Sequence, residues 1–404
     1  MVRACPALAL LTLVACSQAP PPRCPACPDV PVVTEADAGP TEPAPVGLVL
    51  REVTYGDVSG WNEDAVGDAV PALLRSCKKI ARLSDDEPLG GQVDVKAGDF
   101  RRVCERAGTV DPSDHDAARA MFEAELVPHA AAAGSDAEGR FTGYYEAWMN
   151  GSMRRYGVYQ TPLYKKPPDL ITVNLADLSK QRSGRLYGRV IKGRLKPYYT
   201  RGEIMDGALR GHELLWVDDP IDAFFAQVQG SGRVRLNNGK EIRAAYAGKN
   251  GRAYTAIGRV LIAEGHLTRE TVSMQSIRGY LKEHPERQDE IFRHNDGFVF
   301  FAINKGDGPY GSQGVVLTPG RSMAIDRDFI PHTTPIFVDT TGPVAGEDRE
   351  QPFRQLLIAQ DTGGAIRGAV RGDIYFGGDE TAADKAGRMK GTGRYYLLLP
   401  RKHQ

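Results

Sequence analysis

The sequence predicts a mainly β protein with several helices, whose C-terminal third folds into a compact barrel. Seven short apolar stretches follow one another between Gly297 and Leu399, separated by turn-forming residues. Short strands at such spacing are typical of a barrel rather than of a sandwich with long strands. The turn signal Asn237–Lys240 indicates a hairpin in a second β-rich region. Longer helical patterns occupy three segments, 62–83, 112–133 and 253–292.

Length and charge set the broad class. A chain of 404 residues can bury a sizeable core and is expected to hold two domains. The 51 Lys and Arg residues equal the 51 Asp and Glu residues, so no global field favours nucleic acid or an anionic membrane. Nothing after the first 20 residues approaches the length of a transmembrane helix. We therefore expect no nucleic-acid partner, and a monomer.

The first sixteen residues carry a secretion signal. Arg3 precedes an apolar run that ends in Leu13-Val14-Ala15-Cys16, which resembles the signal of a bacterial lipoprotein. We expect Cys16 to become the lipidated first residue, and Ser17 after it is typical of lipoproteins sent to the outer membrane. The predicted location is the periplasmic face of that membrane, held by the lipid anchor. An ordinary signal peptide with an incidental cysteine is the alternative.

Residues 17–47 form a predicted linker rich in Pro and Ala, with no hydrophobic period. Cys24 and Cys27 lie within it, and a zinc site would need a second pair of ligands. A local disulfide or no role at all remains for this pair. Cys77 and Cys104 can pair in an oxidising periplasm.

The elements of the folded part follow in order. Ala and Leu recur at helical spacing in 62–83 and 112–133, and Asp111–Asp114 forms a turn-like start for the second helix. Short strands begin at Phe141, in FTGYYEAW and YGVYQTPLY, and a short helix lies in DDPIDAFFAQVQ. The hairpin and the helical region 253–292 come next. The seven C-terminal strands are GFVFFAIN, GVVLTP, MAID, PIFVDT, FRQLLIAQD, RGDIYFG and RYYLLL.

The segment Leu357–Gly377 sets two carboxylates in apolar and glycine-rich surroundings. Asp361 ends a predicted buried strand, and Asp373 stands at the start of the next one. Burial disfavours the charged form of a carboxylate, so such an Asp can keep its proton near neutral pH. Cleavage of a glycosidic bond needs a general acid of this kind to protonate the leaving oxygen.

Other chemistries have weaker support. The eight His residues show no HExxH and no paired metal spacing, and neither Ser231 nor Ser312 fits G-x-S-x-G, so we expect neither a metal nor a cofactor. Aromatic side chains interleave with amides and hydroxyls near turns, as a polysaccharide cleft requires. Each aromatic taken alone is better explained as a core or strand residue, and only together with the two acids do they favour a polysaccharide cleft. Lys249, Arg201, Arg233 and Arg367 are either partners for substrate carboxylates or ordinary surface charges.

Several long motifs resemble the membrane-bound lytic transglycosylase A family of peptidoglycan enzymes. The resemblance covers Leu48 to Pro400, and its motifs occur in the family's order. The C-terminal third is similar to that family's three-aspartate domain. One departure is His332-Thr333, where the family more often has Pro-Gly, and it concerns the turn near Asp326. The motifs are TGYYEAW, ELLWVDDPIDAFFAQVQGSG, YAGKNGRAYTAIGRVLIAEG, SMQSIRGYLKEHPE, AIDRDFIP, AQDTGGAIRG and RGDIYFG.

The resemblance implies a double-psi β-barrel, similar to barwin, with an inserted second β-rich domain and a cleft between them for the glycan strand. It places the catalytic acid on Asp373, with Asp361 and Asp326 as supporting aspartates. The expected segments are a signal peptide (1–16), a linker (17–47), the first part of the barrel with N-terminal helices (48–150), the inserted substrate-binding domain (151–290) and the three-aspartate part (291–404). The expected substrate contacts are Thr142, Tyr144, Tyr145, Gln160, Gln229, Ser231, Lys249, Asn250 and Gly364.

The implied activity is a lytic transglycosylase reaction. Asp373 would protonate the oxygen between N-acetylmuramic acid and N-acetylglucosamine, and the muramyl C6 hydroxyl would attack C1 to form a 1,6-anhydro end. Asp361 would raise the pKa of Asp373 or simply cap the turn Thr362–Gly364. A hydrolytic muramidase and a non-catalytic wall-binding lipoprotein are the alternatives. The expected partners are peptidoglycan glycan strands, the membrane through the lipid anchor, and wall-synthesis proteins.

Overall fold

The structure, a computed structural model, describes residues 46–178, 184–304 and 306–402. The predicted signal peptide, Cys16, the Cys24–Cys27 pair and nearly all of the predicted linker lie outside these ranges. Among the described helices, none combines the length and the apolar character needed to cross a bilayer.

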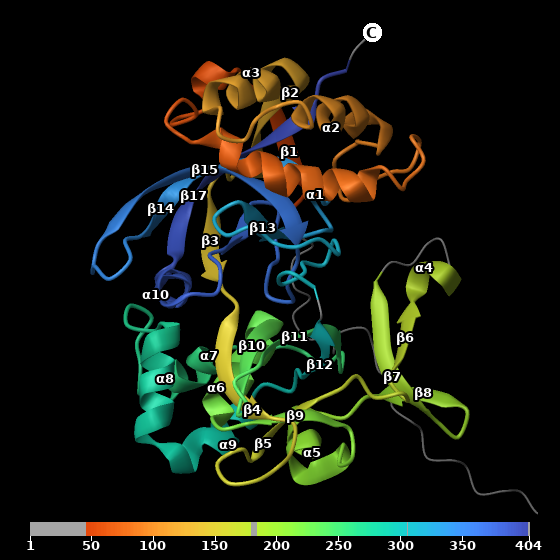
Figure 1. The fold of residues 1–404 in the computed structure, drawn as a ribbon, viewed down its shortest axis with the longest axis vertical. Helices are drawn as coiled ribbons and strands as arrows, with labels where there is room; N and C mark the ends of the chain where they lie inside the picture. Colours follow the sequence, from red (N-terminus) through yellow and green to blue (C-terminus); the bar gives the residue numbers. More distant parts are fainter. Residues whose placement is uncertain (1–45, 179–183, 305, 403–404) are drawn as a thin grey trace, which may run out of the picture. The chain divides into compact units, whose positions relative to one another are not determined.

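The larger sheet contains a closed ring of six strands. Its neighbours run β17-β14-β15-β13-β16-β3, and a further pairing of β3 with β17 closes the ring (Figure 1). Two more strands, β1 and β2, extend the sheet from β17. The bounds are β1 (Leu48–Glu52), β2 (Leu126–Ala133), β3 (Gly139–Tyr144), β13 (Ser322–Ile325), β14 (Pro335–Pro343), β15 (Glu350–Asp361), β16 (Arg371–Tyr375) and β17 (Lys390–Pro400).

Three helices between β1 and β2 share the barrel's hydrophobic core. In α1 (Val70–Ile80), Val70, Leu73, Cys77 and Ile80 recur at helical spacing and are buried. A disulfide joins Cys77 to Cys104 of α2 (Arg101–Ala107), as the cysteine pattern allowed. The other elements here are α3 (His115–Glu125) and the short helices η2 (Tyr55–Asp57), η3 (Val66–Ala69) and η4 (Gly98–Phe100).

Two of the predicted elements are wrong. The helix expected over 112–133 ends at Glu125, and 126–133 form strand β2, which pairs with β1 and β17. Pro128 explains the change, because proline within a helix removes a backbone hydrogen bond and clashes with the preceding turn. The expected strand GVVLTP makes only an isolated bridge, between Val316 and Tyr310.

The chain between β3 and β13 forms a second sheet and a small third one. The second sheet has the order β12-β11-β10-β4-β9-β5, so the strands next to the predicted boundaries at 150 and 291, β4 and β12, both belong to it. Its strands are β4 (Ala147–Ser152), β5 (Thr161–Tyr164), β9 (Glu213–Val217), β10 (Ser231–Leu236), β11 (Glu241–Lys249) and β12 (Val299–Asn304). The third sheet comprises β6 (Ile171–Asn174), β7 (Arg185–Ile191) and β8 (Arg194–Pro197).

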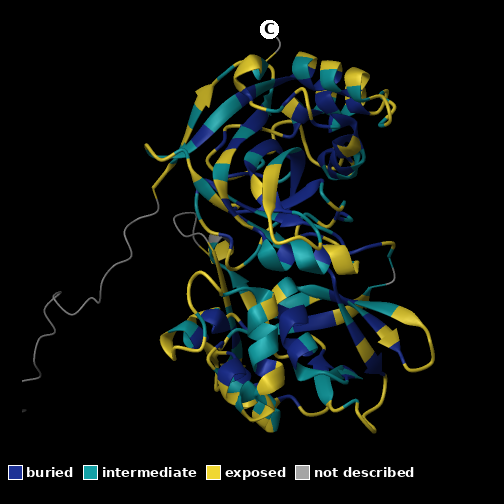
Figure 2. Ribbon diagram, turned by 90° about the vertical axis from the view of Figure 1, so that its left-hand side faces the viewer, coloured by how far each residue is buried: buried dark blue, intermediate teal, exposed yellow. Residues whose placement is uncertain are grey.

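Helices accompany the second sheet where the sequence predicted them. The predicted hairpin is present as β10 and β11, and α6 (Pro220–Gln229) begins at the side-chain cap Asp219. Buried residues line the strands and the inner faces of the helices (Figure 2). The predicted helical region 253–292 contains α7 (Ile257–Ala263), α8 (Met274–Glu283), η6 (Pro285–Arg287) and α9 (Gln288–Arg293). The sequence did not predict α4 (Leu175–Leu178), α5 (Arg201–Glu203), η5 (Ile204–Ala208) or α10 (Glu380–Arg388).

The predicted fold class, a mainly β double-psi barrel with an inserted β-rich domain, is confirmed. Close packing of α10 on β3 depends on Gly143, since a Cβ there would lie 2.9 Å from the Ala386 Cα. This contact fixes the strand that carries part of the candidate site.

Candidate active site

Four neighbouring strands of the barrel align the candidate catalytic residues in one row. On β13, Ala324 lies opposite Asp361 of β15 on one side and opposite Asp373 of β16 on the other. Asp373 in turn lies opposite Thr142 of β3. Residues directly opposite each other on neighbouring strands project to the same face. The two aspartates therefore share one face of the barrel, separated by the small side chain of Ala324.

Asp373 has the properties of a general acid. The Thr142 hydroxyl donates to its Oδ1 at 2.5 Å, and among the described residues no donor reaches Oδ2. Burial raises the pKa of Asp373 to about 6, with the charge of Asp361 acting in the same direction and Arg371 and Thr142 acting against it. A carboxyl with this pKa is half protonated at about pH 6 and about one tenth protonated at pH 7, and one of its oxygens has no described partner.

Asp361 is held by several donors instead. The backbone N–H groups of Ser312 and Thr362 each donate to Oδ1 at 2.8 Å, and the Tyr144 hydroxyl donates to Oδ2 at 2.9 Å. Burial raises the pKa of Asp361, and these donors act in the opposite direction because they stabilise the charge. Asp361 is thus fixed as a neighbour of Asp373 and also caps the backbone that follows it.

Asp326 supports the loop between the other two aspartates. It is 3% exposed, and its Oδ2 accepts the backbone N–H of Gly368 at 2.9 Å. Its Oδ1 accepts from Asp328 N–H at 3.2 Å and lies 3.4 Å from the Arg367 guanidinium. These contacts hold the loop that leads from Asp361 to Asp373, and no described contact joins Asp326 directly to Asp373.

Of the predicted substrate-binding residues near β3, some are partly exposed and one lies in the core. Tyr144 is partly exposed and touches Asp361, and its ring centroid lies 5.3 Å from that of Tyr375. Tyr145 is buried, and its backbone N–H donates to the side chain of Gln229 at 3.1 Å. Ser231 follows on β10 and is partly exposed. The row thus includes Thr142 and adjoins Tyr144, while Tyr145 packs into the second sheet's core.

The other predicted contacts lie further along the chain. Asn250 is buried, with its amide donating to the carbonyls of Tyr199 and Asp296 and its oxygen accepting the Phe298 N–H, so it organises local backbone. Gln160 is exposed and bonds within its own loop, to Arg155 and Gly157. Substrate binding by these two side chains stays a prediction.

Lys249 lies close to the loop that Asp326 holds. Burial lowers the pKa of Lys249, and the charge of Arg367 acts in the same direction. Gly364 is exposed on the same loop. These residues remain available to an anionic or polar ligand, whereas Arg201 is buried and bonds to the Asn295 and Gly297 carbonyls.

The sequence analysis did not identify several groups that contribute to the site or to its surroundings. The Ser312 donor is a backbone N–H, for which side-chain identity gives no signal. Arg371 donates from Nη2 to the Thr142 hydroxyl at 2.7 Å, and its position two residues before Asp373 on a strand could have suggested a shared face. Glu146, where the chain passes from β3 to β4, is fully buried and accepts from Arg233 at 2.7 Å and Arg243 at 3.0 Å.

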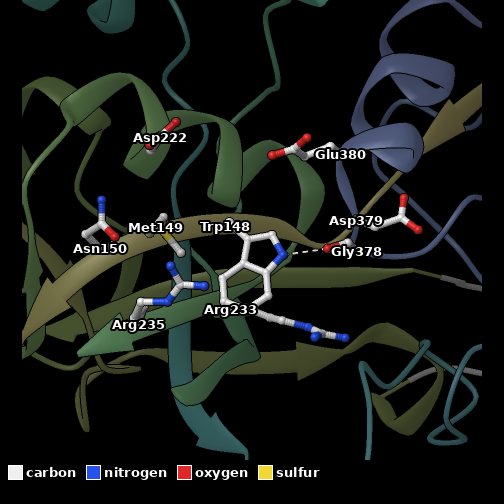
Figure 3. Close-up of a pocket in the computed structure, with 9 residues that line it drawn as sticks. All are labelled: Trp148, Met149, Asn150, Asp222, Arg233, Arg235, Gly378, Asp379 and Glu380. Carbon is white, nitrogen blue, oxygen red and sulfur yellow. Dashed lines mark hydrogen bonds between the residues drawn. The ribbon is translucent and has the colours of Figure 1, made fainter. Parts of the chain in front are cut away.

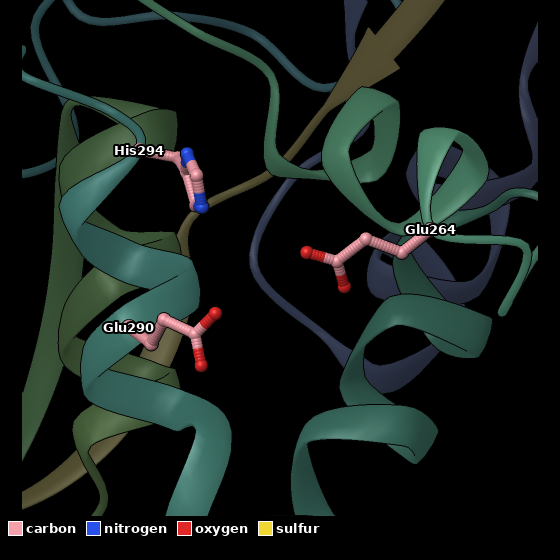
Figure 4. Close-up of side chains that lie close together, drawn as sticks. All are labelled: Glu264, Glu290 and His294. Atoms are coloured by element: carbon pink, nitrogen blue, oxygen red, sulfur yellow. The ribbon is translucent and has the colours of Figure 1, made fainter.

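One group of potential metal ligands lies outside this row. Glu264, Glu290 and His294 are exposed, and their ligand atoms gather within 4.8 Å of one another (Figure 4). The Arg287 guanidinium donates to both glutamates, at 3.1 Å to Glu264 and 2.8 Å to Glu290. The carboxylates therefore already have a cationic partner.

Two family models match the chain: the MltA specific insert domain over residues 140–302 and the 3D domain over residues 321–399. Membrane-bound lytic murein transglycosylase A of Escherichia coli (strain K12) is 34% identical over 267 residues, which are 64% of this chain and 65% of that relative. The alignment thus spans just under two thirds of this curated relative.

Solved structures match over a larger share of both chains. MltA from Neisseria gonorrhoeae has a TM-score of 0.73 and 32% identity, covering 90% of this chain and 96% of that one. E. coli MltA with bound chitohexaose has a TM-score of 0.64 and 25% identity, covering 88% and 95%.

Proposed function

The chain belongs to the membrane-bound lytic murein transglycosylase A family, as its motifs predicted, and from this premise we propose that it is a lyase of peptidoglycan. The bond cleaved is the β-1,4 link between N-acetylmuramic acid and N-acetylglucosamine, and the product carries a 1,6-anhydromuramyl end. One observation carries the proposal: Asp373 has a raised pKa of about 6 and a free Oδ2 beside a fully engaged Asp361.

In the proposed reaction Asp373 acts twice. Its proton passes to the glycosidic oxygen as the C1–O bond breaks, and the N-acetylglucosamine portion leaves with that proton. The C6 hydroxyl of the same muramyl residue then attacks C1, and the Asp373 carboxylate takes up the hydroxyl proton. No water is consumed, and Asp373 ends protonated, ready for another cycle. The intramolecular attack benefits from proximity.

Asp361 helps Asp373 electrostatically. Its two oxygens accept three hydrogen bonds from the chain, so it is poorly placed to attack the sugar or to deprotonate a water molecule. Its charge opposes ionisation of Asp373, which keeps the acid loaded. Thr142 and Arg371 position the acid, while Asp326 maintains the loop between the two carboxylates.

A hydrolytic muramidase is the second candidate, and the strand spacing is what favours it. Asp361 and Asp373 are separated by one intervening strand, so their Cα atoms lie about 9–10 Å apart. Inverting glycosidases hold their carboxyl groups, rather than their Cα atoms, about 6.5–9.5 Å apart to admit a water molecule, and the Cα spacing is compatible with such a separation. The donors on Asp361 argue against its acting as the base.

The N-terminal motif is the basis for the proposed cellular location of the enzyme. We propose that Cys16 carries the lipid and holds the chain at the periplasmic face of the outer membrane, where glycan strands are within reach. The name of the E. coli relative describes that protein as membrane-bound, and another structure of the family holds chitohexaose, which supports a glycan ligand for this chain.

Digestion of purified sacculi by the soluble form tests the function. Anhydromuramyl products, one water lighter than reducing ones, are expected; reducing ends would indicate the hydrolase, and intact sacculi a binding protein. Asp373→Asn should lower turnover about a thousandfold, whereas Asp328→Asn, which removes an exposed carboxylate near the same loop, should not. Full activity of the Asp373→Asn variant would refute the acid assignment.

A further inference from the structure

A charged cavity of about 500 Å³ lies away from the carboxylate row. It is lined by β4, β10 and α6 of the second sheet's domain and by the loop that precedes α10. Figure 3 shows the indole of Trp148 at its centre, with the indole N–H donating to the Gly378 carbonyl at 2.5 Å. The volume is within the range of sites for small ligands, about 300–1,000 Å³.

The two sides of the cavity carry opposite charges. Arg233 and Arg235 lie two residues apart on β10 and so share one face of the strand, and each guanidinium carbon is 5.2 Å from the Trp148 ring centroid. Asp222 and Glu380 lie on the other side of the indole, and the Asp222 carboxylate forms an ion pair with Arg278 (Figure 3). A ligand in this cavity would meet cations and anions at the same time.

Part of this charge is free to bind. The Arg235 side chain is 60% exposed, and its described partner, Glu241, is 3.7 Å away. Glu380, in the first turn of α10, has no described ion pair. Arg233 uses its Nε for Glu146, and its two terminal nitrogens have no described acceptor.

The opposite charges match a ligand that carries both signs better than they match the neutral hydroxyl and acetamido groups of the sugar chain. We propose that the cavity binds the peptide stem of peptidoglycan, a short chain that carries carboxylates and, on its diamino acid, a free ammonium group. The guanidinium groups receive the carboxylates, Glu380 receives the ammonium, and the Trp148 ring covers the aliphatic part. This inference rests on the proposed function, because it names a second part of the same substrate.

The distance along the chain agrees with this assignment. Gly378 is five residues beyond Asp373, so the two lie at most about 17 Å apart. A stem of four or five residues in extended form spans about 13–17 Å. A muramyl residue whose glycosidic bond lies at Asp373 can therefore place its stem in the cavity.

Kinetics on two substrates test the role of the cavity. For Arg235→Glu, the ratio of kcat/KM on stem-bearing strands to kcat/KM on strands stripped of peptide is expected to fall about fivefold. Arg82→Glu is the matched control, since it makes the same charge change at an exposed turn after α1 and should preserve the ratio. An equal ratio in all three proteins would overturn the proposal.

A titration with free stem peptide tests whether the cavity binds the stem, and this test does not depend on cleavage. The chain has three Trp residues, and Trp148→Phe identifies the indole N–H signal of Trp148 by NMR. That signal should shift saturably on adding the peptide, and more weakly in Arg235→Glu. If the wild type cleaves neither strand but the signal shifts, the proposed function fails and the cavity assignment stands. No shift at millimolar peptide refutes the cavity assignment.

Discussion

The burial of Asp373 favours the proposed catalysis but disfavours folding when the side chain is charged. Its position in the barrel row raises its pKa to about 6, above the ordinary value of 3.8, so the folded state disfavours its charge. The same penalty keeps a proton on the acid, which the proposed reaction needs. Function and stability therefore place opposite demands on this one side chain.

The first prediction concerns the pH dependence of activity. An acid with a pKa of about 6 loses its proton above that pH, so kcat/KM should fall about tenfold per unit beyond it. Asp361→Asn removes the like charge that helps to raise this pKa, and the fall should begin about half a unit to one unit lower. Initial rates between pH 4 and 8 give the pH at which kcat/KM begins to fall, and Asp328→Asn is the control. A shift to higher pH in Asp361→Asn would contradict the electrostatic role.

The second prediction concerns stability. Because the folded-state pKa of Asp373 is raised, its charge weakens the fold progressively from about pH 4 to 6, and the penalty is complete above pH 6. Asp373→Asn keeps an acceptor for the Thr142 hydroxyl and removes the charge. Its free energy of unfolding should exceed that of the wild type by about 3 kcal/mol at pH 7.5 and equal it below pH 4. Urea unfolding at both pH values is the measurement, and an equal loss of stability at both would refute the charge argument.

At the scale of elements, the sequence was most informative where local signals agree. The hairpin around Asn237–Lys240, the cap and proline of α6, and the strands that hold Asp361 and Asp373 were all predicted from turn chemistry and apolar pattern. Strand β2 was not, because its four alanines favour a helix locally while pairing with β1 and β17 decides the outcome.

The sequence does not predict the register between distant strands, and this register assembles the site. Asp361 and Asp373 share a face only because both pair with Ala324, and the Ser312 donor lies 49 residues before Asp361. The family resemblance named the three aspartates without showing their unequal surroundings. Asp326 contacts a loop, Asp361 is saturated with donors, and Asp373 keeps one oxygen free.

The third prediction concerns the disulfide between α1 and α2. It closes a loop with a sequence separation of 27, which corresponds to a stabilisation of about 3 kcal/mol. The double substitution Cys77→Ala and Cys104→Ala should lower the free energy of unfolding by that amount, as followed by urea titration without reductant. The matched control is Cys24→Ala with Cys27→Ala, which should leave the unfolding midpoint unchanged. Equal midpoints for both double variants would show that the bond contributes nothing.

At the scale of the whole molecule, Glu146 connects the barrel to the second sheet. Its backbone N–H donates to the Gly377 carbonyl at 2.7 Å, and its buried carboxylate joins Arg233 of β10 and Arg243 of β11. The next contact along the chain, from Trp148 to Gly378, links the same two segments. This group of contacts holds β4 and β10 against the loop that follows β16.

The fourth prediction follows from this burial. Glu146→Gln leaves two partly buried guanidinium groups without their counter-ion, which should lower the free energy of unfolding by about 3 kcal/mol. Glu138→Gln is the control, because that glutamate is exposed and lies 4.0 Å from Arg394; its effect should stay below about 0.5 kcal/mol. Thermal or urea unfolding compares the two, and equal effects would show that Glu146 is not essential to the junction.

The pairing of β3 with β16 determines when a newly made chain can assemble the candidate site. Thr142 and Asp373 are 231 positions apart, so a ribosome must add the whole intervening stretch before they can meet. The second sheet's domain lies within that stretch and can assemble earlier. The surroundings that raise the pKa of Asp373 therefore form only when the barrel ring closes.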